Sequence, residues 1–145
     1  MRKIEHIGIA VKNMDEANEI YRAMLNTEPY KSEAVESEGV ITSFFQMGES
    51  KIELLAATNE NSPIAKFIEK RGEGIHHIAF DVEDIDAEIA RLERRGFILI
   101  NHKAKPGADN KIVAFLHPKS SNGVLVELCQ DTGPTRKELF EEGLR

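Results

Sequence analysis

The sequence predicts an α+β fold in which two tandem β-α-β-β-β modules form one curved mixed β-sheet, cleft-like or barrel-like, with helices outside. The main observation is a repeat. Residues 4–10 (IEHIGIA) align with residues 75–81 (IHHIAFD) at a shift of 71, which places His6 on His77 and Val11 on Val82. In both copies a strand-like run is followed by helical spacing of apolar residues, and then by a hairpin.

Each copy carries its own helix signals. In the first, Asn13 predicts an N-cap, with Glu16 three residues later as in a capping box. One apolar stripe is expected from Ala17, Ile20, Tyr21, Met24 and Leu25. In the second, Asp84 predicts the cap and Gly96 the end of the helix. The inward-facing residues there are expected to be Ile85, Ile89 and Leu92.

The hairpins repeat as well. ITSFFQMGESKIELL (residues 41–55) parallels KIVAFLHPKSSNGVLVEL (residues 111–128), with Phe44 again 71 positions before Phe115. Beyond the turns the shift becomes 74, so that Glu53 falls on Glu127. Three extra residues in the second turn account for this change.

The predicted domain covers residues 1–130, with module 1 at about 1–60, a linker helix at 61–73 and module 2 at about 74–130. In the linker, Ser62 predicts the cap, Pro63 the first helical position and Gly72 the end. Neither module could bury a four-stranded sheet alone, so we expect the two to share one core around a cleft. Residues 131–145 predict a helical tail for packing or subunit contact, with a capping-box pattern at Thr135 and Glu138.

Composition narrows the function classes. The chain has 145 residues and a net charge of -6, from 19 basic and 25 acidic residues. The basic residues are scattered, which argues against nucleic-acid binding. No apolar stretch is long enough to span a bilayer and no signal peptide is evident, so we expect a cytoplasmic protein without membrane contact. The single Cys129 excludes an internal disulfide and fits a small strand residue better than a nucleophile.

The repeat predicts one shared site. Near two-fold symmetry would bring His6, His77, Glu53 and Glu127 to the cleft, whereas His76, which matches Glu5, should face away because neighbouring strand residues alternate. A carboxylate on an inward strand face is costly unless it is paired or bound to a metal. Two imidazoles and two carboxylates suit cobalt, zinc, manganese or nickel, with coordination positions left open. A lone strand histidine would more often be structural, and the argument depends on the recurrence. His117 and His102 are weaker candidates for substrate contact.

With these residues in view, the chain resembles the vicinal oxygen chelate superfamily, and within it the methylmalonyl-CoA epimerase family, over residues 1 to about 130. The segments that carry the resemblance are HIGIAVKNMDEA, GESKIELL, SPIAKFIEKRGEGIHHIAFDVEDIDA and HPKSSNGVLVEL. The last two are the most specific, since related lyases share the fold and metal positions but not this linker and closing hairpin.

The resemblance implies a divalent metal, cobalt first, held by His6, Glu53, His77 and Glu127. Some members of the family carry Gln where this chain has Glu53. The implied reaction interconverts the epimers at C2 of methylmalonyl-CoA, with Glu127 as one acid/base group. A homodimer is also expected.

A second acid/base group is needed, because the proton leaves one face and returns on the other. Where some members carry a carboxylate this chain has Thr42, a poor base. Glu53 is the first substitute, followed by Gln46, a metal-bound water or a carboxylate of SEAVESEG (residues 32–39). For the phosphates of coenzyme A, a positive rim is expected from Lys103, Lys105 and Lys119.

Two other functions fit the sequence less well. A metalloenzyme like lactoylglutathione lyase would share the fold, the metal and the enediolate chemistry, and would act on the glutathione hemithioacetal of methylglyoxal. A metal-free binding module of the same fold would not need all four ligand positions filled.

Overall fold

The computed structural model describes residues 1–133 and confirms the two-module α+β architecture. Module 1 contains β1 (Lys3–Ala10), α1 (Met14–Leu25), β2 (Lys31–Val35), the short 3-10 turn η1 (Glu36–Glu38), β3 (Val40–Met47) and β4 (Ser50–Ala57). The linker helix is α2 (Pro63–Arg71). Module 2 contains β5 (Gly74–Asp81), α3 (Ile85–Arg94), β6 (Lys105–Pro106), β7 (Lys111–Leu116), the 3-10 turn η2 (Pro118–Ser120) and β8 (Val126–Asp131).

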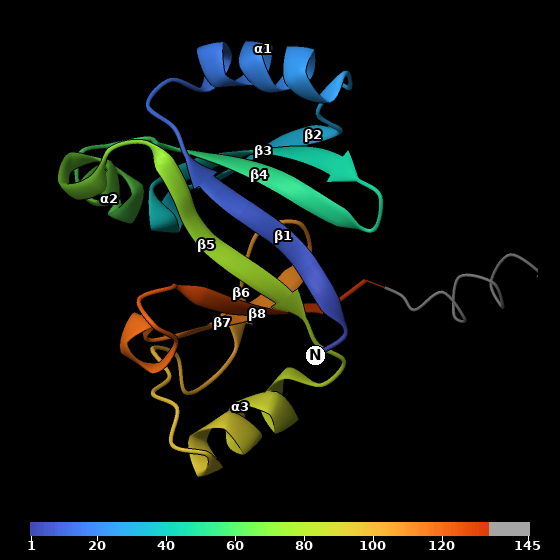
Figure 1. Cartoon of the computed structure of the whole chain (residues 1–145), viewed down its shortest axis with the longest axis vertical. Coiled ribbons are helices and arrows are strands. Elements are labelled where there is room, and N and C mark those ends of the chain that lie inside the picture. Colours follow the sequence, from blue (N-terminus) through green and yellow to red (C-terminus); the bar gives the residue numbers. More distant parts are fainter. Residues whose placement is uncertain (134–145) are drawn as a thin grey trace, which may run out of the picture.

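All eight strands form one curled sheet in the order β2-β3-β4-β1-β5-β8-β7-β6. Each module contributes four neighbouring strands, and the modules meet where β1 and β5 pair antiparallel. Ile7 lies directly opposite Ile78 across this seam, and the two are equivalent in the repeat. The local two-fold axis of the fold therefore passes between them. α1 and α3 lie outside the sheet at opposite ends of the molecule (Figure 1).

The predicted helix caps are present. The backbone NH of Glu16 donates to Asn13 Oδ1 at 3.0 Å, and the NH of Ala87 donates to Asp84 Oδ1 at 3.1 Å. Ser62 caps α2 through its hydroxyl oxygen, with Pro63 in the first turn. Each cap satisfies an NH that the helix leaves without a partner and stabilises the helix by about 1 kcal/mol.

The packing face of α1 is narrower than predicted. Ala17 is buried, and Tyr21 and Leu25 pack with it against the outer face of β3 and β4. Ile20 and Met24, however, are 61% and 62% exposed. At about 100° per residue, positions 17, 21 and 25 cover an arc of roughly 80°, and positions 20 and 24 lie outside this arc, on the side of Ala17. The expected five-residue stripe is therefore wrong for these two residues.

The packing of α3 confirms its prediction. Ile85, Ile89 and Leu92 are all buried, and they form one cluster with apolar residues from the outer faces of β7 and β8. The inner faces of the same strands carry Phe115 and Glu127, because side chains alternate along a strand. The helices thus cover the convex side and leave the concave side for the site.

The end of the chain limits one prediction. β8 extends to Asp131, one residue beyond the expected domain boundary. The proposed tail cap at Thr135 and Glu138 lies outside the described residues. Across residues 1–133, the helices are too short and too polar for any to cross a lipid bilayer.

Candidate active site

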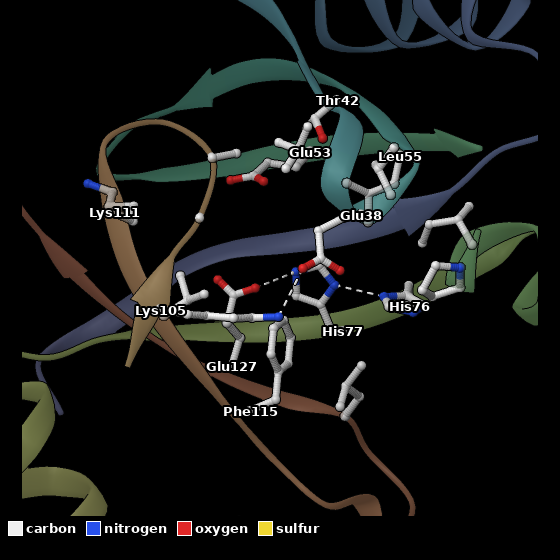
Figure 2. A pocket seen from close by; sticks show the side chains of 18 of the residues that line it. Glu38, Thr42, Glu53, Leu55, His76, His77, Lys105, Lys111, Phe115 and Glu127 are labelled. Atoms are coloured by element: carbon white, nitrogen blue, oxygen red, sulfur yellow. Dashed lines mark hydrogen bonds and ion pairs between the residues drawn. The ribbon is translucent and has the colours of Figure 1, made fainter. Parts of the chain in front are cut away.

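The imidazoles of His6 and His77 face each other at the seam between the modules. Their Nε2 atoms are 2.9 Å apart, and both side chains are buried. Glu127 completes the group, with its Oε1 3.3 Å from His77 Nε2 and its Oε2 3.6 Å from His6 Nε2. One ligand atom from each of the three residues lies within 4.8 Å of the other two. Figure 2 shows His77 and Glu127 converging from different strands on the cavity.

This donor set fits a divalent cation. Two neutral imidazoles with facing Nε2 lone pairs repel unless a proton or a cation lies between them. A buried carboxylate beside them also needs a positive partner. Imidazole nitrogen and carboxylate oxygen are ligands common to zinc, cobalt, manganese and nickel sites.

His76 does not face away as expected, and the reason is a β-bulge. The pairing of β1 with β5 shifts register twice, which leaves Glu5 as an extra residue in β1 and His76 as an extra residue in β5. A bulge places two residues opposite one and breaks the strict alternation of side chains. Consequently Glu5 is buried beside His6, and His76 lines the same cavity as His77 (Figure 2).

The two bulge residues, Glu5 and His76, contact the Nδ1 atoms of His6 and His77, which are the ring nitrogens that do not face each other. Glu5 Oε1 lies 2.9 Å from His6 Nδ1, and His76 Nδ1 lies 2.9 Å from His77 Nδ1. Burial lowers the pKa of His76 to about 4. His76 is therefore neutral at pH 7 and can accept the Nδ1 proton of His77. This arrangement leaves the Nε2 lone pair of each histidine for a metal, as outer partners of ligating histidines commonly do.

Small residues lie across the strand from each histidine. His77 pairs with Gly8, and His6 pairs with Ala79, which is the repeat equivalent of Gly8. A Cβ atom added to Gly8 would lie 2.2 Å from Cε1 of His77. Only glycine leaves room for this imidazole. A glycine inside a strand was the available sequence signal for such a close approach.

The carboxylate of Glu127 has polar partners on several sides. Burial alone would raise the pKa of its carboxyl, but hydrogen bonds with His6 and His77 hold that pKa well below its usual range. The thiol of Cys129 donates to Glu127 Oε2 at 2.6 Å. Burial, together with the charge of Glu127, raises the pKa of this thiol far above its ordinary value. Cys129 is thus a protonated strand residue and not a nucleophile, as the sequence indicated.

Glu53 is also buried, but it lies beside Nδ1 of His6 and not beside Nε2. Its Oε2 lies 2.9 Å from His6 Nδ1. Burial would lower the pKa of His6, whereas hydrogen bonds to Glu127, Glu5 and Glu53 raise it well above its ordinary value. Three predicted ligands therefore converge on the Nε2 side. Glu53 adds its negative charge on the Nδ1 side.

A cavity of about 350 Å³ opens over these residues. Among the predicted substrate contacts, Thr42 and Lys105 line it. Gln46 instead donates from Nε2 to the carbonyl oxygen of Gly48 in the β3–β4 turn.

The other three predicted contacts do not line this cavity in the described structure. They are Lys103, His117 and Lys119. His117 Nδ1 accepts a hydrogen bond from the backbone NH of Lys119 and caps η2, so it acts as a turn residue. Lys103 is exposed in the loop before β6.

Glu38 from η1 also lines the cavity, and Lys105 Nζ donates to its Oε1 at 3.0 Å. This pair joins the two modules across the mouth of the cavity (Figure 2). Glu38 belongs to the SEAVESEG segment, one of the sources considered for the second acid/base group. The sequence did not single it out within that segment.

Asp109 forms a second link between the modules, and the sequence did not predict it. Asp109, in the turn between β6 and β7, accepts hydrogen bonds from Tyr30 Oη and Lys51 Nζ, each at 2.7 Å, and pairs with Lys31 at 2.7 Å. Lys51 also lies 3.2 Å from Glu5. The turn of module 2 is thereby tied through Lys51 to the carboxylate that holds His6.

Comparison with known proteins shows the family to which the chain belongs. Residues 5–115 match the Glyoxalase/Bleomycin resistance protein/Dioxygenase superfamily, so the chain belongs to that superfamily and, within it, to the methylmalonyl-CoA epimerase family. The ethylmalonyl-CoA/methylmalonyl-CoA epimerase of Cereibacter sphaeroides is 43% identical over 130 residues, which are 88% of this chain and 97% of that protein. The mitochondrial methylmalonyl-CoA epimerase of Homo sapiens is 36% identical over 129 residues, 88% of this chain and 73% of the relative.

A solved structure gives the same result. A variant of the Streptomyces coelicolor methylmalonyl-CoA epimerase, in complex with 2-nitronate-propionyl-CoA, superposes with a TM-score of 0.88 at 35% identity. The match covers 92% of this chain and 96% of that one. The resemblance stated from the sequence is therefore confirmed.

Proposed function

We propose that this protein interconverts the two epimers of methylmalonyl-CoA by moving the proton at C2, with the help of a divalent metal. The observation that carries the proposal is the meeting of His6, His77 and Glu127 in one cavity of a chain that belongs to this family. The barrier to this reaction is mostly the cost of the enolate-like charge beside the thioester.

His6, His77 and Glu127 would hold the metal, with Glu53 as the fourth predicted ligand. When bound, a divalent cation supplies Lewis-acid stabilisation of developing negative charge on oxygen. Cobalt is our first choice, and zinc, manganese and nickel suit the same donors. The protein's part is to keep the Nε2 lone pairs aimed at one point, through Glu5 and His76.

Glu127 is the first acid/base group. Its carboxyl is ionised at neutral pH, because His6 and His77 hold its pKa well below the usual range. It is buried on the module 2 wall, where apolar neighbours such as Phe115 limit the access of water. A carboxylate in this position can accept the C2 proton and return it.

The second acid/base group must act from the opposite side of the substrate, and module 1 forms the facing wall. Glu53 is the first candidate. Its support is burial on that wall and a negative charge beside His6. Glu38 is the alternative, since it lines the same cavity and carries a carboxylate that Lys105 holds at the mouth. Thr42 lies on this wall as a polar contact for the substrate.

Exchange of the C2 proton with solvent deuterium tests the proposal. Each epimer of methylmalonyl-CoA is incubated separately in D2O with the metal-loaded protein and with the variants Glu127→Gln, Glu53→Gln and Glu38→Gln. In a two-base reaction, loss of one base stops exchange from one epimer and spares exchange from the other. Glu127→Gln should therefore stop exchange from one epimer only. The variant that lacks the second base should stop exchange from the other epimer only.

Full epimerisation by Glu127→Gln would remove that residue from the mechanism. Turnover of the glutathione hemithioacetal of methylglyoxal, without turnover of methylmalonyl-CoA, would favour the lyase-like alternative instead. The expected homodimer and cytoplasmic location stay predictions, and light scattering coupled to size-exclusion chromatography tests the first.

A further inference from the structure

A second hollow lies beside the active-site cavity and is lined by cations. It is a groove of about 550 Å³ between α2 and the segment that follows β7. Three basic side chains from α2 line it, namely Lys66, Lys70 and Arg71. No carboxylate is among its lining residues in the described part of the chain. In a protein of net charge -6, this is a local concentration of positive charge.

The three cations are available to a ligand. All three side chains are exposed. Within residues 1–133 none of them forms an ion pair, whereas Lys105 and Lys111 beside the active-site cavity pair with Glu38 and Asp131. Lys66 and Lys70 are four residues apart, so they project from the same side of α2 about 6 Å apart along its axis.

The groove is continuous with the active site. His76, His77 and Leu125 line both hollows. The far wall of the groove is apolar, with Ile75 62% exposed and Val124 41% exposed. In Figure 1, α2 (green) and the turn at residues 118–120 (orange) lie on the same side of the molecule, and β5 starts beside α2. A ligand with its reactive end at His77 can therefore leave the cavity along this groove.

We infer that this groove binds the phosphate-bearing part of coenzyme A, with Lys66, Lys70 and Arg71 contacting the phosphates and the apolar wall contacting the linking arm. The inference rests on the proposed function, which sets an acyl thioester at His77. Multiple phosphates attract a group of cations more strongly than a single anion does, and charge-assisted hydrogen bonds add to this attraction. On this inference the phosphates lie in the groove and not at the expected rim of Lys103, Lys105 and Lys119.

The test is a charge reversal with a matched control. The groove variant is Lys70→Glu with Arg71→Glu, at the end of α2. The control is Arg94→Glu with Arg95→Glu, which makes the same change in net charge at the end of α3. The Kd for coenzyme A, measured by titration calorimetry, should rise about tenfold or more in the groove variant and less than twofold in the control.

Kinetics provide a second measurement. The KM for methylmalonyl-CoA should rise in the groove variant by a similar factor, with kcat little changed. A truncated thioester, methylmalonyl-pantetheine without the nucleotide, should show the same KM in the groove variant and the control. The loss of affinity for coenzyme A should also shrink at high salt, because the contacts are exposed.

The outcomes separate the two claims. If the wild-type protein does not epimerise methylmalonyl-CoA, the proposed function fails, while the Kd comparison still decides the groove. If epimerisation is present but both double variants bind coenzyme A equally well, the groove inference is overturned and the function stands. A wild-type protein that does not bind coenzyme A overturns the groove inference as well.

Discussion

Glu5 and His76 occupy equivalent positions in the two modules, and each contacts the Nδ1 atom of the histidine that follows it. Both are bulge residues, so the same irregularity occurs twice in one sheet. The symmetry of the site therefore includes the residues that orient the ligands. The partners differ chemically, since one is a carboxylate and the other a neutral imidazole, and this difference leads to the first prediction.

Replacing Glu5 by Gln should weaken metal binding by about ten- to a hundredfold, because a partner of this kind orients the imidazole and increases its basicity. Calorimetric titration with cobalt measures the effect. The matched control is Glu60→Gln, an exposed residue outside the site. An affinity equal to that of the control would show that Glu5 does not position His6.

Replacing Gly8 by Ala should displace the imidazole of His77, since the added Cβ would overlap its ring. We expect cobalt binding to fall strongly and the melting temperature to drop. Gly133→Ala is a suitable control, because among residues 1–133 its Cβ would meet only a carboxylate oxygen of Asp131, at 3.2 Å. Unchanged cobalt affinity in Gly8→Ala would contradict the close approach.

Replacing Asp109 by Asn should destabilise the protein by about 1–3 kcal/mol at pH 7, through the loss of charge-assisted hydrogen bonds. Despite the opposing effect of burial, Lys31, Lys51 and Tyr30 lower the pKa of Asp109 to about 2. Its ordinary value is 3.8. The unfolded chain therefore binds this proton more readily than the folded one. The stabilisation is complete above the ordinary pKa and is lost as the pH falls towards 2.

Thermal melts between pH 2 and 7 check this prediction. The difference in stability between wild type and Asp109→Asn should be largest near neutral pH and should shrink below about pH 4. A difference that stays constant over the whole range would mean that the charge of Asp109 is not responsible.

The narrow packing face of α1 can be tested by truncation. Leu54→Ala removes a side chain that is fully buried beneath α1 and should cost about 2–5 kcal/mol in the free energy of unfolding. Met24→Ala should change it by less than about 0.5 kcal/mol, because Met24 is largely exposed. Urea denaturation of both variants gives the comparison. A large loss of unfolding free energy in Met24→Ala would show that Met24 belongs to the packing face of α1 after all.

Much of the site could be predicted because duplication acts on whole strands. The shift of 71 was sufficient to pair His6 with His77, and the shift of 74 identified Glu127. The bulges could not be predicted in the same way. An extra residue shifts the alternation of side chains by one position, but Glu5 and His6 are both polar, so this shift is not visible in the apolar pattern. A polar residue such as Glu5 fits an outward position equally well.

Contacts between distant segments were the other gap. Asp109 meets Lys51 and Tyr30 only because the sheet curls, and nothing in the local sequence around residue 109 indicates these partners. The same holds for the pair of Lys105 with Glu38. Lys103 and Lys105 lie in or beside the loop before β6, as expected. Which of them faces the cavity depends on partners such as Glu38, and composition does not reveal these partners.

The meeting of Ile7 and Ile78 on the local two-fold axis also bears on the origin of this protein. Two identical half-length chains, paired through the same strand, would already have brought two imidazoles to a common point. Fusion of the two genes would then have released the halves from having to remain identical. Glu5 and His76 record that freedom, as do the three residues added to one turn, while the ancestral pairing of strands was retained.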